Sequence, residues 1–117
     1  MKKIGRKLIA VGDLVFIKMH PILVDTNGNV ASWRKILDKL ERDFEIEKVV
    51  PGHGSLSDKS SILNMEEYFS TISDALHNPQ ELARLRQRYK DYRTFPIISG
   101  FGRTVSFISK EMKSNLL

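Results

Sequence analysis

Cysteine is absent from the 117 residues of the chain. Disulfide bonds and thiolate metal ligands are therefore excluded, so a metal site would have to use histidine or oxygen ligands. Long apolar runs are missing as well, since no segment approaches the roughly 20 apolar residues that a membrane-spanning helix needs. The basic start is followed by the short apolar run 8–11, whereas a signal-peptide core takes about 7–15 residues. These absences predict a soluble, cytoplasmic protein without a membrane partner.

The charge balance is basic, with 19 lysines and arginines against 14 acidic residues and a net charge of +5. Such a balance raises the question of nucleic acid as a partner. The densest cluster is distributed around a predicted helix rather than along one face, and no nucleic-acid-binding motif accompanies it. We interpret it as a solvated helix surface and do not expect nucleic acid to bind, although a protein-interaction or weak nucleic-acid-binding module remains an alternative function. The cluster comprises Arg84, Arg86, Arg88, Lys90 and Arg93.

The hydrophobic pattern predicts a single α/β domain over residues 1–117, with a small, mostly antiparallel or mixed sheet covered by about four helices. Short aliphatic runs predict strands, and a turn cluster follows Pro21 at 25–29. The predicted strands span 8–11, 14–17 and 46–50, and the predicted helices span 31–43, 58–76, a stretch starting at 79 and a stretch starting near 103.

Apolar residues at helical spacing support the first two helices. The first stripe begins at Trp33 with Ser32 or Asn29 as candidate caps, and the second helix has Ser57 as its candidate cap. The third helix starts with Asn78, Pro79 and Glu81, a typical helix start. The two stripes consist of Trp33, Ile36, Leu37, Leu40 and Phe44, and of Ile62, Met65, Phe69, Ile72 and Leu76, with Leu63 and Tyr68 in support.

Two segments contain residue types that can carry chemistry. In Val49-Val50-Pro51-Gly52-His53-Gly54, a histidine between glycines follows a strand, and ligands often bind at the carboxyl end of strands. In Gly12-Asp13-Leu14-Val15-Phe16, an aspartate lies among aliphatic residues. A buried carboxylate needs a cation, a metal or backbone donors. Taken singly, each has an ordinary alternative: His53 as an exposed loop histidine, and Asp13 as a turn residue between two strands.

Together, these two segments resemble the C-terminal half of the metallo-β-lactamase superfamily, the glyoxalase-II-like zinc hydrolases. The resemblance covers about residues 8–75 and includes His20-Pro21 and the helix at Trp33; it fades over the helices at 79–117. It implies a four-layer αββα sandwich, of which this chain is a part. It further implies that Asp13 bridges two metal ions and that His53 completes the shell of the second. Zinc is the expected metal, with manganese or iron as alternatives, and a metal-bound hydroxide is the family's usual nucleophile.

The chain departs from this family in its remaining ligands. The His-x-His-x-Asp-His motif is absent. Besides His53, the chain has two further histidines, His20 and His77. His20 is a candidate for the edge of the site, with an ordinary loop histidine as the alternative, and His77 fits the end of a helix. A catalytic zinc ion normally takes about three protein ligands and a water molecule. The metal-ligand candidates are therefore Asp13 and His53, and no catalytic residue is assigned.

These observations predict a truncated or degenerate metal-dependent hydrolase domain that is inactive as a monomer. A partial sandwich leaves an apolar sheet face uncovered, and soluble proteins seldom expose such a patch. We therefore expect a homodimer, or a missing N-terminal half, to cover that face. The alternatives are an active metallo-hydrolase that dimerisation or a partner completes, and a non-enzymatic chain that binds no metal.

Overall fold

The computed structural model describes residues 2–4, 8–23, 30–43, 46–53, 56–95, 97 and 99–115, and it describes side chains over 15–23, 30–43, 46–51, 56–95, 97 and 99–112. Within these residues the predicted α/β class is confirmed, with helices and a small sheet in one chain. The elements are β1 (Lys2–Ile4), β2 (Leu8–Phe16), α1 (Val30–Glu41), β3 (Lys48–His53), β4 (Ser57–Asp58), α2 (Ser60–Asp74), α3 (Pro79–Arg88) and α4 (Phe101–Asn115).

The sheet is mixed, which is one of the two forms that the sequence predicted. Its strand order is β1-β2-β3-β4. β1 pairs with β2, and β4 with β3, in antiparallel fashion, whereas the central strands β2 and β3 are parallel. Parallel neighbours need a crossover connection, and α1 provides it between β2 and β3. β1 and β4 were not predicted, because strands of three and two residues are too short to show an alternating pattern.

β2 is one continuous strand where the sequence predicted two. Leu8–Phe16 passes through Gly12 and Asp13 without a turn, so Asp13 lies inside a strand. The glycine nevertheless has a structural effect, because the register with β3 shifts on both sides of Gly12. Such irregularities bend a strand locally. The predicted turn at 25–29 lies outside the described residues.

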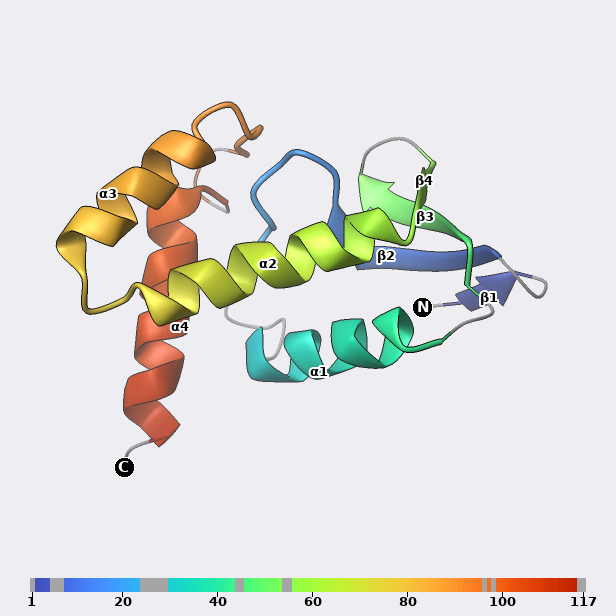
Figure 1. Ribbon diagram of the computed structural model, residues 1–117, viewed down its shortest axis with the longest axis horizontal. Helices are drawn as coiled ribbons and strands as arrows, with labels where there is room; N and C mark the ends of the chain where they lie inside the picture. Colours follow the sequence, from blue (N-terminus) through green and yellow to red (C-terminus); the bar gives the residue numbers. More distant parts are fainter. Residues whose placement is uncertain are drawn as a thin grey trace.

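The helices α1 and α2 lie side by side and contribute nearly half of the described core residues, while α3 and α4 gather at the end of α2 that is farther from the sheet (Figure 1). The second predicted stripe is largely confirmed: four of its members, Ile62, Met65, Phe69 and Ile72, are at most 2% exposed. In the first stripe, Ile36 is 37% exposed, and Leu63 beside the second stripe is 44% exposed. Leu63 lines a groove together with Lys35 and Asp38 of α1, so it borders the contact between the helices and does not belong to its buried centre.

Helix caps were predicted with mixed success. Asn78 is confirmed as the cap of α3, because its side-chain oxygen accepts a hydrogen bond from the Glu81 N–H at 3.1 Å. The prediction of Ser57 as the cap of α2 is wrong, since this residue lies in β4. The carboxylate of Asp58 instead accepts the Ser60 N–H at 2.9 Å. An aspartate serves there because it accepts donors that the first helical turn leaves unpaired.

The amino end of α1 is capped from a distant part of the chain. Glu111 in α4 accepts hydrogen bonds from the backbone N–H groups of Val30 and Ala31, each at 3.1 Å. Of the two predicted caps, Ser32 lies inside α1 and Asn29 lies outside the described residues. The contact of Glu111 could not be predicted, because no local pattern reveals a partner about 80 positions away. α4 itself begins at Phe101, slightly earlier than predicted.

The described helices differ from membrane-spanning ones. None of them combines the length and the apolar character that a bilayer span requires.

Candidate functional site

The two predicted metal ligands lie on neighbouring strands. Gly12 of β2 is in register with Pro51 of β3, and Phe16 is in register with His53. Because β2 and β3 are parallel, Asp13 and His53 approach the same, carboxyl edge of the sheet. The described part of the structure includes the backbone of both residues but not their side chains. The backbone thus brings the two strands together, and metal binding by Asp13 and His53 remains a prediction.

A cavity of about 450 Å³ opens at this edge of the sheet. Phe16, the register partner of His53, forms part of its wall. The remaining wall comes from the segment after β2, from β4, from the first turns of α2 and from the end of α3. We call this the strand-end cavity; it is lined by Phe16, Ile17, Lys18, Ser57, Ser61, Asn64, Arg88, Asp91 and Tyr92.

Backbone hydrogen bonds hold two walls of the strand-end cavity together. Met19 and Arg93 form an isolated parallel bridge, in which the Arg93 N–H donates to the Lys18 carbonyl at 3.0 Å and the His20 N–H donates to the Arg93 carbonyl at 2.9 Å. Lys18 has a φ of +50°, a conformation that L-residues adopt rarely. The bridge offsets this strain and fixes the position of Lys18 relative to Asp91 and Tyr92.

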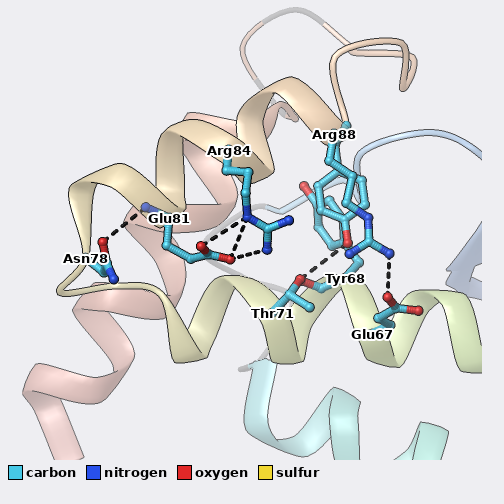
Figure 2. A network of polar contacts seen from close by, with 8 residues as sticks. Glu67, Tyr68, Thr71, Asn78, Glu81, Arg84 and Arg88 are labelled. Atoms are coloured by element: carbon cyan, nitrogen blue, oxygen red, sulfur yellow. Dashed lines mark hydrogen bonds and ion pairs between the residues drawn. The ribbon is translucent and has the colours of Figure 1, made fainter.

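The arginines of α3 have local partners. Arg88 forms an ion pair with Glu67 of α2, and Arg84 pairs with Glu81 one turn earlier on its own helix (Figure 2). The Arg86 guanidinium lies over the Phe101 ring, 4.8 Å from its centroid. Three members of the basic cluster thus have described partners within the chain, and the absence of nucleic-acid binding stays a prediction.

His20 lies in the described core, where it is 4% exposed. Its Nδ1 is 2.6 Å from the Tyr68 hydroxyl, which is 3.0 Å from the Thr104 hydroxyl, and Thr104 donates to the Gly100 carbonyl at 3.1 Å. These three bonds need three protons, and the carbonyl supplies none. All three hydrogen bonds can form only if the His20 Nδ1–H donates to Tyr68, the Tyr68 hydroxyl donates to Thr104, and the Thr104 hydroxyl donates to Gly100. His20 therefore carries a proton on Nδ1 and, when neutral, none on Nε2.

The environment of His20 favours its neutral form. Burial lowers the pKa of this imidazole, and the positive charge of Arg86 lowers it further. The ring centroid lies 5.7 Å from that of Tyr92, which lines the strand-end cavity. His20 itself is absent from the described lining. His20 lies outside the helices and strands and contacts the ring of Tyr92 in the cavity lining, and its place at the edge of a metal site stays a prediction.

His77 lies far from the strand-end cavity. It is exposed in the turn after α2, whereas Ser61 in the first turn of α2 lines the cavity. A helix of 15 residues is about 22 Å long at a rise of roughly 1.5 Å per residue. The structure therefore agrees with the interpretation of His77 as a helix-end residue.

A cluster of three carboxylates lies between α1 and α2, apart from the strand-end cavity. Asp38, Glu41 and Glu66 have side-chain oxygens within 4.8 Å of one another, and a groove that Asp38 and Glu66 help to line has a volume of about 610 Å³. Burial raises the pKa of Glu66 to about 7, and the hydrogen bond and charge of Glu41 contribute to the shift. Its Oε1 atom is shielded from solvent without a hydrogen-bond partner among the described residues. Between the ordinary pKa of a glutamate and about 7, the folded state therefore favours the protonated form of Glu66.

We expect Glu66→Gln to stabilise the fold in alkaline buffer. The folded state raises the pKa of Glu66. The stability that protonated Glu66 contributes is therefore fully present below the ordinary pKa of a glutamate, and it is lost as the pH rises through about 7. Glutamine removes the charge and keeps an amide donor for Glu41. Because the side chain is partly exposed, we expect a gain of about 1 kcal/mol at pH 8. Urea unfolding at pH 8 and pH 5 tests this; an equal effect at both values would contradict it.

Sequence reasoning did not identify Lys18, Arg88, Asp91 or Tyr92 as neighbours of the predicted site. Their side chains line one cavity, yet they come from two segments about 70 positions apart. Spacing along a helix or strand gives no signal for this arrangement. Comparison with known proteins adds no further assignment: no family model matches the chain, and neither a curated protein nor a solved structure matches it.

Proposed function

We propose that the chain is a metallo-β-lactamase-like domain that contributes a partial metal site and does not hydrolyse substrate as a monomer. The observation that supports this is the parallel register of β2 and β3, with Gly12 opposite Pro51 and Phe16 opposite His53. Two segments that resemble metal-binding motifs, 40 positions apart, lie on neighbouring strands and approach one edge of the sheet. This arrangement is compatible with one shared site for the two segments.

The donor atoms fit zinc chemistry only in part. Asp13 and His53 would offer a carboxylate and an imidazole, which suit zinc and also manganese or iron. The described lining of the strand-end cavity adds one carboxylate, Asp91, and no histidine. The described residues thus fall short of the usual catalytic set. A bound metal would supply Lewis acidity and a hydroxide nucleophile, and the further ligands for that activity would come from a second copy of the chain or from another segment.

Metal content per chain tests this proposal directly. Protein purified without chelator or a metal-binding tag is loaded with zinc, desalted and measured by mass spectrometry for metal and by light scattering for mass. We expect zinc to be retained, and Asp13→Ala and His53→Ala each to lose most of it, since each removes a direct ligand. Retained zinc should accompany a dimer, because two donors alone hold the metal weakly. Folded protein that retains no zinc in either oligomeric state would overturn the proposal.

A matched control separates this site from the acidic cluster. Glu66→Gln removes one of the three carboxylates between α1 and α2 and leaves β2 and β3 unchanged. We expect this variant to retain as much zinc as the parent protein. Loss of zinc in Glu66→Gln with normal retention in Asp13→Ala and His53→Ala would place the metal in the groove between the helices and contradict the proposed site.

A further inference from the structure

The strand-end cavity has the size and position of a small-molecule site. Its volume of about 450 Å³ lies within the range of roughly 300–1,000 Å³ that is typical of ligand pockets. It is formed where the parallel strands end, the usual place for ligands in open α/β sheets. Its walls are already held in place by the bridge between Met19 and Arg93, so that little ordering is needed when a ligand binds.

The charged groups of the cavity favour an anion. Lys18 and Arg88 contribute two cations to the lining and Asp91 contributes one carboxylate. Glu67 holds the Arg88 guanidinium through one terminal nitrogen (Figure 2). A guanidinium has five N–H donors in a fixed plane, so such an ion pair positions the group and leaves it donors for a second oxyanion.

The uncharged groups of the cavity describe the rest of the ligand. Phe16, Ile17 and Tyr92 give it an apolar side, and the Tyr92 ring is fixed by stacking on Tyr68, with centroids 6.0 Å apart and planes 14° apart. Ser57 and Asn64 line the cavity as well and offer polar groups. Apolar walls with a few placed polar and charged groups are the usual composition of a site for a small organic molecule.

We propose that the strand-end cavity binds a small organic anion, in which a carboxylate or phosphate group meets Lys18 and Arg88 and an aromatic or aliphatic body packs against Phe16 and Tyr92. The carboxylate of Asp91 lies on the same lining and disfavours a higher negative charge on the ligand. This binding needs no metal ion, so it goes beyond the partial metal site and is tested separately from it.

Benzoate and benzamide form a matched pair of probes, because they share shape and ring and differ in charge. Titration in chelator-containing buffer is followed by the backbone amide signals of Lys18, Ser61 and Tyr92 in ¹⁵N-resolved NMR spectra. We expect saturable shifts for benzoate with a dissociation constant near 1 mM, given its small size, and binding of benzamide that is about tenfold weaker. Phenyl phosphate extends the series and distinguishes a preference for phosphate from one for carboxylate.

Three variants and one control decide the assignment. Lys18→Gln and Arg88→Gln are each expected to weaken benzoate binding about tenfold, whereas Asp91→Asn is expected to strengthen it about threefold. Arg84→Gln is the control, because it lies on the same helix, pairs with Glu81 and is outside the cavity lining. Equal weakening in Arg84→Gln would show general charge attraction and overturn the proposal. Equal affinities for benzoate and benzamide, or an absence of saturable shifts with folded protein, would also overturn it.

Discussion

Replacement of Tyr68 by alanine is expected to lower the free energy of unfolding by about 3–5 kcal/mol, the usual cost of removing a buried aromatic ring. Tyr68 is fully buried and has ring contacts with Phe69, Tyr89 and Tyr92, at centroid distances of 5.7, 4.9 and 6.0 Å. It joins α2 to the segment that follows α3, which includes Tyr92 of the strand-end cavity. A loss of this size is a large part of the stability of a small domain.

Urea unfolding measures this effect, with fluorescence of the single tryptophan as the probe. Trp33 lies 5.1 Å from the Phe69 ring and therefore reports on the α1–α2 contact. Leu63→Ala is the control from the same helix, since Leu63 is 44% exposed and its loss should cost less than about 0.5 kcal/mol. Similar losses in the two variants would show that the described core around Tyr68 does not determine stability.

Tyr68→Phe separates the hydroxyl from the ring. The ring contacts remain, but the Nδ1–H of His20 and the oxygen of Thr104 lose their partner. Leaving buried polar groups unsatisfied costs about 1–3 kcal/mol, so we expect this variant to lie between the parent protein and Tyr68→Ala. A stability equal to that of the parent would contradict the proton arrangement deduced for the chain from His20 to Gly100.

The helices were predictable from the sequence because their signals are local. The stripe from Ile62 to Ile72 and the cap at Asn78 depend on residues within a few positions of each other, and both are present. The strand pattern was less informative at Gly12. A glycine within an aliphatic run is compatible with a register shift inside one strand and also with a turn between two strands. The cap of α1 by Glu111 is a tertiary contact that has no local signal.

The candidate site shows the same limit of sequence reasoning. A resemblance in two short segments was enough to select Asp13 and His53, and the register of β2 and β3 places their strands together. The residue types around them were not predictable, because Lys18 and Arg88 line one cavity and come from segments about 70 positions apart. The bridge between Met19 and Arg93 joins these segments. His20 could not be distinguished from an exposed histidine, since its burial depends on Tyr68 and Tyr92.

Acid is expected to destabilise the protein through His20. The folded state lowers the pKa of this residue, through burial and through Arg86, so the unfolded chain takes up a proton first as the pH falls below about 6.5. The stability that neutral His20 contributes is fully present above the pKa of His20 in the unfolded chain. It is lost as the pH falls from there toward the lower pKa of His20 in the folded chain. One proton taken up on unfolding corresponds to a loss of up to about 1.4 kcal/mol per pH unit.

The variant His20→Asn isolates this contribution, because its amide offers a donor near the position of Nδ1 and does not titrate. The measured quantity is the difference between parent and variant in the slope of unfolding free energy against pH from 5 to 7, so a constant loss of packing in the variant cancels. The background Glu66→Gln removes the opposite trend, since Glu66 stabilises the fold toward lower pH. In that background we expect the stability of the parent His20 chain to fall on acidification and that of His20→Asn to change less. Parallel slopes would show that His20 takes up its proton as readily in the folded chain as in the unfolded one, and the buried neutral imidazole deduced from its contacts with Tyr68 and Tyr92 would then be wrong.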